Sequence, residues 1–175
     1  MGIPGLTYVD GFVLAEDQAR LLAAIDGEPW LSDLKRRVQH YGYRYDYKAR
    51  KVTPSMFLGP LPAWSMPLAS RLVAGGYMAE PPDQLIVNEY EPGQGIAAHV
   101  DCVPCFGPVI CSVTLGSHCV MEFAATAADA EELLLLEPGS LLVMAGESRY
   151  DWRHAIPARK SDKVDGRVLP RGRRV

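Results

Sequence analysis

The chain has no apolar stretch close to the roughly 18 residues that a membrane-spanning helix needs. Its first residues, Met1-Gly2-Ile3-Pro4, contain neither the basic region nor the apolar run of a signal peptide. These two absences predict a cytoplasmic protein with no membrane partner. Basic residues are not in excess either, because 18 Lys and Arg are set against 21 Asp and Glu, and the net charge of −3 creates no overall attraction to nucleic acid.

Cysteine is scarce, with four residues in 175. Cys102 and Cys105 form a C-x-x-C pair, but no second pair follows at the spacing of a zinc site. An even number of cysteines in a cytosolic protein does not imply disulfides. Cys111 and Cys119 lie in alternating apolar segments and are expected to be small buried residues. The pattern therefore gives no reason to expect a disulfide, and a metal or redox role of the C-x-x-C pair is the less favoured alternative.

Glycine and proline are plentiful, at 16 and 14 residues, and favour many short elements joined by turns over a helical bundle. Two segments are predicted to be helical, residues 15–25 and residues 66–73, and each is followed by glycine. Residues 38–47 alternate well enough for strands broken at Gly42. The N-terminal part of the chain is therefore expected to contain two helices and a short strand region between them.

From residue 84 onward the pattern changes to short strands separated by turns rich in glycine and proline. The predicted strands comprise residues 85–90, 96–99, 109–115, 120–123, 141–144 and a segment around 154–156, in addition to a short strand near residues 8–12. Two helices followed by many strands indicate an α+β fold whose core is a double-stranded β-helix (jelly roll) with two N-terminal supporting helices. The length suits one such domain over residues 1–175.

Two histidines and one carboxylate are placed for a metal site. His99 and Asp101 lie two residues apart, so their side chains point to the same face where the chain is extended. His154 follows 55 positions later (154 − 99), and antiparallel sheets bring such distant strands side by side. This donor set leaves three positions of the metal open, as in non-haem Fe(II) oxygenases. Arg149, five residues before His154, is expected either to brace the metal shell or to form a salt bridge within its turn.

Basic and aromatic residues alternate in the N-terminal half. Two basic clusters, Lys35-Arg36-Arg37 and Lys48 with Arg50 and Lys51, flank a run that contains Tyr41, Tyr43, Tyr45 and Tyr47. Phosphate contacts and base stacking require such residues, although a set of solvated faces is the alternative. On the substrate side we expect Tyr43, Tyr45 and the intervening Arg44. Both tyrosines are predicted to share one face of a strand, either open to a base or buried against the second helix.

Several motifs occur in a defined order along the chain. The run LIVNEYEPGQGI at residues 85–96 precedes His99-Val100-Asp101, the segment SVTLG occupies residues 112–116, and LLVMAGESRY at residues 141–150 precedes His154. Together with the neighbourhood of Tyr41-Gly42-Tyr43, this series resembles the AlkB family of Fe(II)/2-oxoglutarate dioxygenases. The motifs are most similar to the branch whose eukaryotic member modifies the tRNA wobble position.

The resemblance implies a full set of site residues. It assigns the iron ligands to His99, Asp101 and His154, and it makes 2-oxoglutarate and O2 the co-substrates. Asn88 and Tyr90 would donate hydrogen bonds to 2-oxoglutarate, and Arg174 would pair with one of its carboxylates. Arg174 matches the first arginine of the family's closing R-x5-R strand, and the second arginine would fall five residues beyond Val175. We therefore expect a chain that is truncated within its closing C-terminal strand.

The substrate is less well determined than the co-substrate. The leading hypothesis is oxidative demethylation of an N-alkylated nucleobase in DNA or RNA, as in DNA repair, with a flipped or single-stranded base entering past the tyrosine run. Family members that repair alkylated bases often place an acidic residue two positions after the aspartate ligand, where this chain has Val103. The alternatives are hydroxylation or demethylation of a tRNA wobble base or of a methylated protein side chain, and a non-catalytic metal-binding jelly roll.

Overall fold

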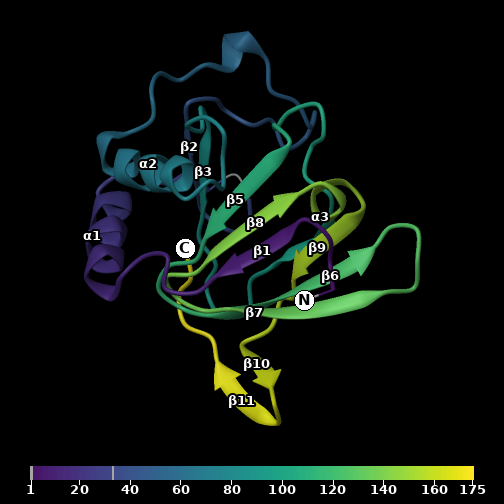
Figure 1. Ribbon diagram of the computed structural model, residues 1–175. Helices are drawn as coiled ribbons and strands as arrows, with labels where there is room; N and C mark the ends of the chain where they lie inside the picture. Colours follow the sequence, from purple (N-terminus) through teal and green to yellow (C-terminus); the bar gives the residue numbers. More distant parts are fainter. Residues whose placement is uncertain (1, 33) are drawn as a thin grey trace.

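The computed structural model describes residues 2–32 and 34–175 (Figure 1). One sheet has the order β1 (Leu6–Val9), β8 (Leu141–Ala145), β5 (Val109–Val113), and the other has the order β4 (Ile96–His99), β9 (Trp152–Ile156), β6 (Cys119–Ala125), β7 (Glu131–Leu136). Two further strand pairs are β2 (Val38–Tyr41) with β3 (Leu85–Asn88), and β10 (Ser161–Val164) with β11 (Arg167–Pro170). Every pairing among these strands is antiparallel.

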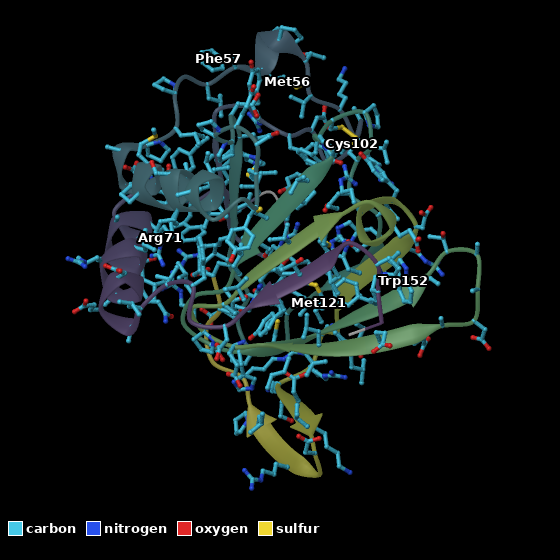
Figure 2. The ribbon with its side chains drawn as sticks, in the orientation of Figure 1. Met56, Phe57, Arg71, Cys102, Met121 and Trp152 are labelled. Carbon is cyan, nitrogen blue, oxygen red and sulfur yellow. A yellow bond between two sulfur atoms is a disulfide. The ribbon has the colours of Figure 1, made fainter. Side chains whose placement is uncertain are left out.

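Strand β8 shows how the two sheets share the core. Leu142 and Met144 belong to one buried cluster together with Met121 of β6, which is labelled in Figure 2. Leu141 and Val143, one residue out of phase, belong instead to a second buried cluster on the other face. Alternate residues of a strand point to opposite faces, so β8 is covered on both sides. This arrangement of stacked antiparallel sheets is the predicted double-stranded β-helix.

The two predicted helices cover the outer face of the first sheet. They are α1 (Ala15–Asp26) and α2 (Met66–Ala74), which lie beside each other in Figure 1. Leu21 and Ile25, four residues apart, form the buried face of α1, and Leu72 is buried on α2. An apolar face of this spacing is stable as a helix only against another apolar surface. The helices end within one residue of the predicted bounds.

The last two residues lie between two other parts of the chain. Arg174 exchanges both backbone hydrogen bonds with Tyr90, which follows β3, at 2.8 and 2.9 Å. Val175 exchanges both with Leu115, which follows β5, at 2.8 and 3.0 Å. The buried Val175 side chain joins the cluster beneath the helices. This pairing holds the backbone of Arg174 beside Tyr90.

Three strands were not predicted, and their surroundings explain why. β7 lies at the edge of its sheet, and β10 and β11 form a hairpin that extends away from the rest of the molecule (Figure 1). The sequence of β7, EELLLL, shows no alternation of apolar and polar residues that would mark a strand, and the projecting hairpin has no apolar face. A one-turn helix, α3 (Glu147–Tyr150), precedes β9, and two short 3-10 helices occupy Pro54–Met56 and Ala63–Ser65. Within the described residues, no helix is long and apolar enough to cross a membrane.

Candidate active site

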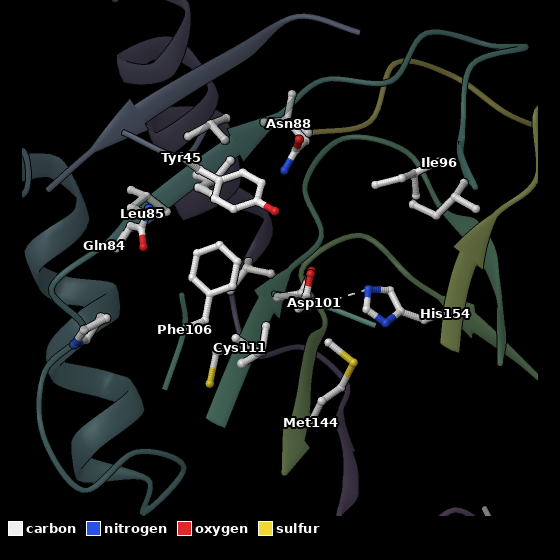
Figure 3. A pocket seen from close by; sticks show the side chains of 18 of the residues that line it. Tyr45, Gln84, Leu85, Asn88, Ile96, Asp101, Phe106, Cys111, Met144 and His154 are labelled. Atoms are coloured by element: carbon white, nitrogen blue, oxygen red, sulfur yellow. Dashed lines mark ion pairs between the residues drawn. The ribbon is translucent and has the colours of Figure 1, made fainter. Parts of the chain in front are cut away.

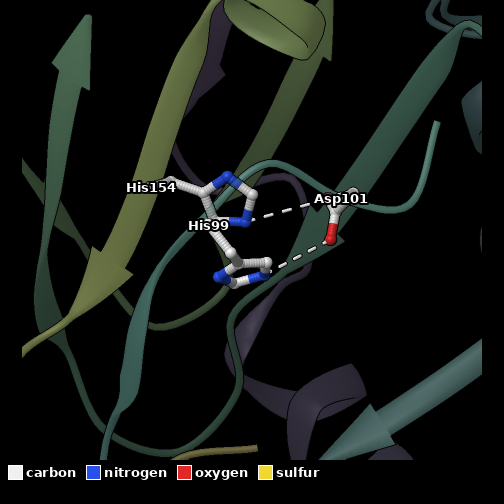
Figure 4. A group of neighbouring side chains, drawn as sticks. All are labelled: His99, Asp101 and His154. Carbon is white, nitrogen blue, oxygen red and sulfur yellow. Dashed lines mark ion pairs between the residues drawn. The ribbon is translucent and has the colours of Figure 1, made fainter. Parts of the chain in front are cut away.

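His99 and His154 face each other across two paired strands. β4 runs antiparallel to β9, and their register places His99 opposite His154. The ring centroids lie 4.4 Å apart (Figure 4). Gly95, directly before β4, lets the chain pass close to the end of β9, because a Cβ there would lie 2.1 Å from the carbonyl oxygen of Ile156. One antiparallel register therefore joins two histidines that are far apart in the sequence.

Asp101 completes the group from outside the strand. It lies two residues beyond the end of β4, so the following loop, and not the strand ladder, positions its carboxylate. Its Oδ1 is 3.5 Å from His99 Nε2, and its Oδ2 is 3.7 Å from His154 Nε2 (Figure 4). One donor atom from each of the three residues lies within 4.8 Å of the others. The structure thus brings together the three residues predicted as metal ligands.

The protonation states of these side chains suit a bound cation. Burial, together with the nearby His99 and Arg149, lowers the pKa of His154 to about 4 against the opposing influence of Asp101. Its imidazole is therefore neutral at pH 7 and offers a lone pair. Burial alone would raise the pKa of Asp101, but the two histidines and Arg149 outweigh it and lower that pKa. The carboxylate is therefore ionised at pH 7.

The ring of His99 is oriented by its own strand. Burial lowers the pKa of His99, but the Asp101 carboxylate and the Ala97 carbonyl oxygen together outweigh burial and raise it. Nδ1 lies 2.8 Å from that carbonyl oxygen, which can only accept, so Nδ1 carries the proton. In the neutral ring Nε2 is then the unprotonated nitrogen, whose lone pair can bind a metal, and it is the atom that faces Asp101. In metal-binding histidines the ring nitrogen that does not bind the metal commonly donates such a hydrogen bond.

A pocket of about 640 Å³ joins this group to the residues predicted to hold the co-substrate (Figure 3). Asn88, Tyr90 and Arg174 all line it. The Arg174 side chain is buried, and its Nη2 donates to Thr114 Oγ1 at 2.9 Å. Its Nε is also buried, and it has no hydrogen-bond partner among the described residues. A buried guanidinium with an unused N–H beside a pocket fits a carboxylate ligand.

A second arginine, Arg36, also lies close to Tyr90 and lines the same pocket. The guanidinium carbons of Arg36 and Arg174 lie 5.7 and 5.6 Å from the Tyr90 ring centroid. Arg36 Nε donates to Asn88 Oδ1 at 2.8 Å, so the amide nitrogen of Asn88 is the group left to donate to a ligand. Arg36 was predicted as part of a phosphate-binding cluster and not as a residue of this pocket. Its only sequence signal is basic charge, which does not distinguish the two roles.

The C-terminal arginines point in three directions. Arg171 is paired with the buried Asp162 at 2.6 Å. Arg173 is paired with the buried Glu89 at 2.6 Å, on the side of the molecule that carries α1. Of these three arginines, Arg174 is the one that lines the pocket. Arg174 is also the arginine that the family resemblance assigned to the co-substrate, and that role stays a prediction.

The tyrosine run is not the regular strand that the sequence predicted. β2 ends at Tyr41, and Gly42 then turns the chain with a φ of +74°. A Cβ at Gly42 would lie 1.9 Å from a backbone oxygen of Asp83, so the turn requires glycine. Beyond it, Tyr43 forms only an isolated bridge. The prediction that Tyr43 and Tyr45 share one strand face was therefore wrong.

The two tyrosines instead have different surroundings. Tyr45 lines the pocket and packs against Phe106, with ring centroids 5.2 Å apart (Figure 3). Tyr43 lies outside the pocket lining and packs against the exposed Phe57 (Figure 2). Arg44 is exposed to solvent. Of the three residues expected on the substrate side, the structure places Tyr45 at the pocket. Phe106 was missed because nothing in the pattern marks a single aromatic residue of a loop.

The basic clusters do not form one uniform surface. Arg37 donates two hydrogen bonds to the buried Glu89, at 2.5 and 2.7 Å, and so belongs to an ion-pair network. Arg50 lines the pocket and donates to the carbonyl oxygen of Val100 at 3.2 Å. Lys35, Lys48 and Lys51 are exposed. These exposed lysines, together with the exposed Arg50, are the residues of the clusters that suit contact with phosphates.

Cys102 and Cys105 are joined by a disulfide, which the sequence pattern did not predict (Figure 2). The correction has a local cause, since the tight turn after Asp101 brings their Cα atoms to 5.2 Å. Cys111 and Cys119 are free; Cys119 is buried as expected, whereas Cys111, which was also expected to be buried, is only half-buried. Burial raises the pKa of the Cys111 thiol to about 11, which makes it unreactive at neutral pH.

Comparison with known proteins agrees with this geometry. The chain matches the 2OG-Fe(II) oxygenase superfamily over residues 6–175. It is 38% identical over 196 residues to the "Alkylated DNA repair protein ALKBH8 homolog" of Arabidopsis thaliana, covering 99% of this chain and 57% of that protein. It is 39% identical over 172 residues to the "tRNA (carboxymethyluridine(34)-5-O)-methyltransferase ALKBH8" of Mus musculus, covering 92% of this chain and 25% of that protein.

The fold is also found in a solved structure. OsALKBH1 superposes with a TM-score of 0.74 at 16% identity, over 98% of this chain and 94% of that one. The chain spans little more than half the length of the plant relative and a quarter of the mouse relative. The family match over nearly the whole chain, the shared jelly roll and the His-Asp-His group lead to one assignment. The chain belongs to the 2OG-Fe(II) oxygenase superfamily and is an AlkB-like dioxygenase that works with Fe(II) and 2-oxoglutarate.

Proposed function

We propose that this dioxygenase oxidises a C–H bond of a modified base at the wobble position of tRNA. The observation that carries the proposal is the similarity to ALKBH8 proteins along at least nine-tenths of the chain, since the vertebrate members are named for carboxymethyluridine 34 of tRNA. Methyl transfer, the reaction in those names, is not dioxygenase chemistry. Because the chain matches only a quarter of those proteins, the proposal takes from them the RNA and not that reaction.

Three residues would hold the iron. His99, Asp101 and His154 offer two imidazole nitrogens and one carboxylate oxygen, which is the ligand set that non-haem Fe(II) oxygenases use. Bound Fe(II) supplies the activation of O2 that couples decarboxylation of 2-oxoglutarate, to succinate and CO2, with insertion of one oxygen atom into a substrate C–H bond. The chain contributes the carboxylate, which offsets part of the charge of the ion, and all three side chains line the pocket.

Three others would orient the co-substrate. Arg174 offers its buried Nε–H to one carboxylate of 2-oxoglutarate, while Thr114 restrains the far end of the same guanidinium. Asn88 offers its amide N–H, because its oxygen is already held by Arg36. Tyr90 lines the same pocket, and the guanidinium carbons of Arg36 and Arg174 lie 5.7 and 5.6 Å from its ring centroid. Two positive charges beside one pocket suit an anionic co-substrate.

The remaining wall of the pocket suits a planar base. Tyr45, Tyr47 and Phe106 line it, and the Tyr45 ring contacts both of the others, with centroids 4.8 and 5.2 Å apart. Aromatic rings give a nucleobase a stacking surface and keep water away from the reacting atoms. Arg50, which lines the same pocket, places a positive charge near the backbone of an entering nucleotide. Nucleic acid is therefore the proposed partner.

The test compares substrates under one set of conditions. The protein is incubated with Fe(II), 2-oxoglutarate and tRNA, and succinate and the modified nucleosides are measured by mass spectrometry. We expect succinate formation that depends on tRNA, together with a wobble uridine derivative that gains one oxygen atom. Asp101→Ala is the control that removes one iron ligand and should form no product. Succinate without any change in the tRNA would contradict the proposed substrate.

Oxidative demethylation is the second candidate, and one observation favours it. The Arabidopsis relative, matched over 99% of the chain, is named for repair of alkylated DNA. In this reaction a hydroxylated N-methyl group leaves as formaldehyde, so the two candidates differ in product. Parallel incubations with an oligonucleotide that contains an N-methylated base and with a methylated peptide separate them. Formaldehyde from the oligonucleotide supports demethylation of nucleic acid, and formaldehyde from the peptide alone moves the activity to proteins.

A further inference from the structure

Arg149 is a buried charge whose hydrogen bonds are not part of the site described so far. It lies on α3, one turn before β9, and it is 2% exposed, which makes it the largest fully buried side chain among the described residues. Its guanidinium carbon lies 5.0 Å from the Tyr150 ring centroid. An arginine buried to this extent requires partners for its N–H groups, because an unsatisfied buried charge is strongly unfavourable.

Those partners are all backbone oxygens of one loop. Nη1 donates to the carbonyl oxygen of Asp101 at 3.1 Å, Nε to that of Gly107 at 3.3 Å, and Nη2 to that of Cys102 at 3.5 Å. Among the described residues, no carboxylate forms an ion pair with Arg149. The buried Arg171 is bonded differently. Its Nε and Nη2 donate to the carboxylate of Asp162, and its Nη1 donates to the carbonyl oxygen of Pro157, outside the metal group. Arg149 thus donates its hydrogen bonds to the backbone of the loop and not to a carboxylate.

The loop needs such support because it lies outside the sheet. β4 ends at His99, and the strand ladder resumes only at Val109. The Asp101 carboxylate is therefore carried by a segment without ladder hydrogen bonds, and Arg149 contacts this segment at both of its ends. The short element α3 leads directly into β9, which carries His154. The stretch from α3 to β9 therefore positions two members of the metal group. It holds His154 through the strand pairing of β9, and it holds Asp101 through the hydrogen bonds of Arg149.

We infer that Arg149 is a positioning residue of the metal centre, which holds the backbone of Asp101 and thereby sets the affinity for the divalent ion. The inference rests on the metal-binding role proposed above for Asp101, and it does not depend on the tRNA substrate. Replacing a residue that orients a metal ligand through hydrogen bonds typically weakens metal binding by about 10- to 100-fold. A lysine at this position keeps the charge but cannot reach three carbonyl oxygens at once.

The experiment measures Mn(II) binding, with Mn(II) alone as a redox-silent probe and without co-substrate. Arg149→Lys and Arg149→Met are compared with the unchanged protein by electron paramagnetic resonance titration. Thiol reductant is present throughout, so that the disulfide between Cys102 and Cys105 does not restrain the same loop. We expect both variants to bind Mn(II) about 10- to 100-fold more weakly. The thermal unfolding midpoint of the metal-free protein is recorded for each variant.

Arg171→Lys is the matched control. Arg171 is also a buried arginine with hydrogen bonds to a carboxylate and a backbone carbonyl, but it lies away from the three metal-binding side chains. It should lower the unfolding midpoint while Mn(II) affinity stays unchanged. Equal loss of Mn(II) affinity in the Arg149 and Arg171 variants would show that Arg149 acts only through general stability, and unchanged affinity in Arg149→Lys would overturn the inference directly.

Two further variants keep the result interpretable. If neither Arg149 variant folds, Tyr150→Ala removes the ring beside the guanidinium at a partly exposed position and decides the question. Weaker Mn(II) binding by about two- to fivefold, the size of a cation–π contact, supports the inference, and unchanged binding overturns it. Asp101→Ala tests the underlying assignment separately. Tight Mn(II) binding without the carboxylate would remove the proposed metal site itself, whatever Arg149 does.

Discussion

We expect Arg174→Met to weaken 2-oxoglutarate binding while leaving the protein folded. The backbone of Arg174 is held by its two hydrogen bonds to Tyr90, and a side-chain substitution does not change these. The guanidinium donates one hydrogen bond to Thr114 Oγ1 and keeps a buried Nε–H for a ligand. Methionine matches the length of the arginine stem but offers neither the charge nor the donor. The main loss should therefore fall on the co-substrate.

The size of the effect follows from the kind of interaction that is lost. A hydrogen bond to a charged group contributes about 1.5–3 kcal/mol net, and each 1.4 kcal/mol changes a dissociation constant tenfold. The 2-oxoglutarate dissociation constant should therefore rise by about 10- to 150-fold in Arg174→Met. Arg174→Lys keeps a point charge without the planar fork, so its effect should lie near the lower end of this range. The free energy of unfolding should fall only by about 1 kcal/mol, because Thr114 loses one hydrogen-bond partner.

The assay is titration calorimetry of 2-oxoglutarate into Mn(II)-loaded protein without O2, so that no turnover occurs. Arg173→Lys is the control, since the neighbouring Arg173 is paired with Glu89 and Asp26 and does not line the pocket. It should lower the unfolding midpoint and leave 2-oxoglutarate affinity unchanged. A folded Arg174→Met protein that binds 2-oxoglutarate as tightly as the unchanged protein would refute the assigned role of Arg174.

Three further results are expected. Replacing Asp162 by Asn should destabilise the protein by about 3–5 kcal/mol at pH 7, as loss of one partner of a buried ion pair does. Burial would raise the pKa of Asp162, but Arg171 and Arg159 outweigh it and lower that pKa below the usual 3.8. Because this pKa is lowered, ionised Asp162 stabilises the protein above about pH 4, and this stabilisation is lost as pH falls further. The unfolding midpoints of the unchanged protein and the Asn variant should therefore converge in acid, and a difference that stays constant with pH would contradict this. Alkylation of the unfolded protein without reductant should label two cysteines, and four after reduction of the Cys102–Cys105 bond, as counted by intact mass; four labels without reductant would show that no bond had formed. Asp101→Ala should abolish succinate production while the far-ultraviolet circular dichroism stays near native, and succinate at the unchanged rate would remove Asp101 from the metal group.

Local patterns in the sequence were enough for the elements that are covered by apolar surface. The helices predicted at residues 15–25 and 66–73 are α1 and α2, and the strand predicted at residues 96–99 is β4 without any change of bounds. Each has an apolar face or a flanking turn that depends only on neighbouring residues. The hairpin of β10 and β11 lacked such a face because it extends from the body of the protein, so its pattern carried little signal.

The chemical identity of the site was also determined by the sequence itself. His99, Asp101 and His154 predicted a metal site of the non-haem iron type, and the resemblance of the surrounding motifs to the AlkB family implied dependence on Fe(II) and 2-oxoglutarate. That information is carried by residue type and spacing along the chain. It does not require knowledge of which strands pair.

The tertiary structure decided what the residue types leave open. Arg149, Arg171, Arg173 and Arg174 carry the same guanidinium, yet one holds the Asp101 loop, two pair with buried acids, and one lines the pocket. Likewise, Tyr45 lines the pocket and the nearby Tyr43 does not. A side chain acquires its role from the acceptors that strand register and turns bring within about 3 Å of it. Those acceptors come from distant parts of the chain, so no local pattern specifies them.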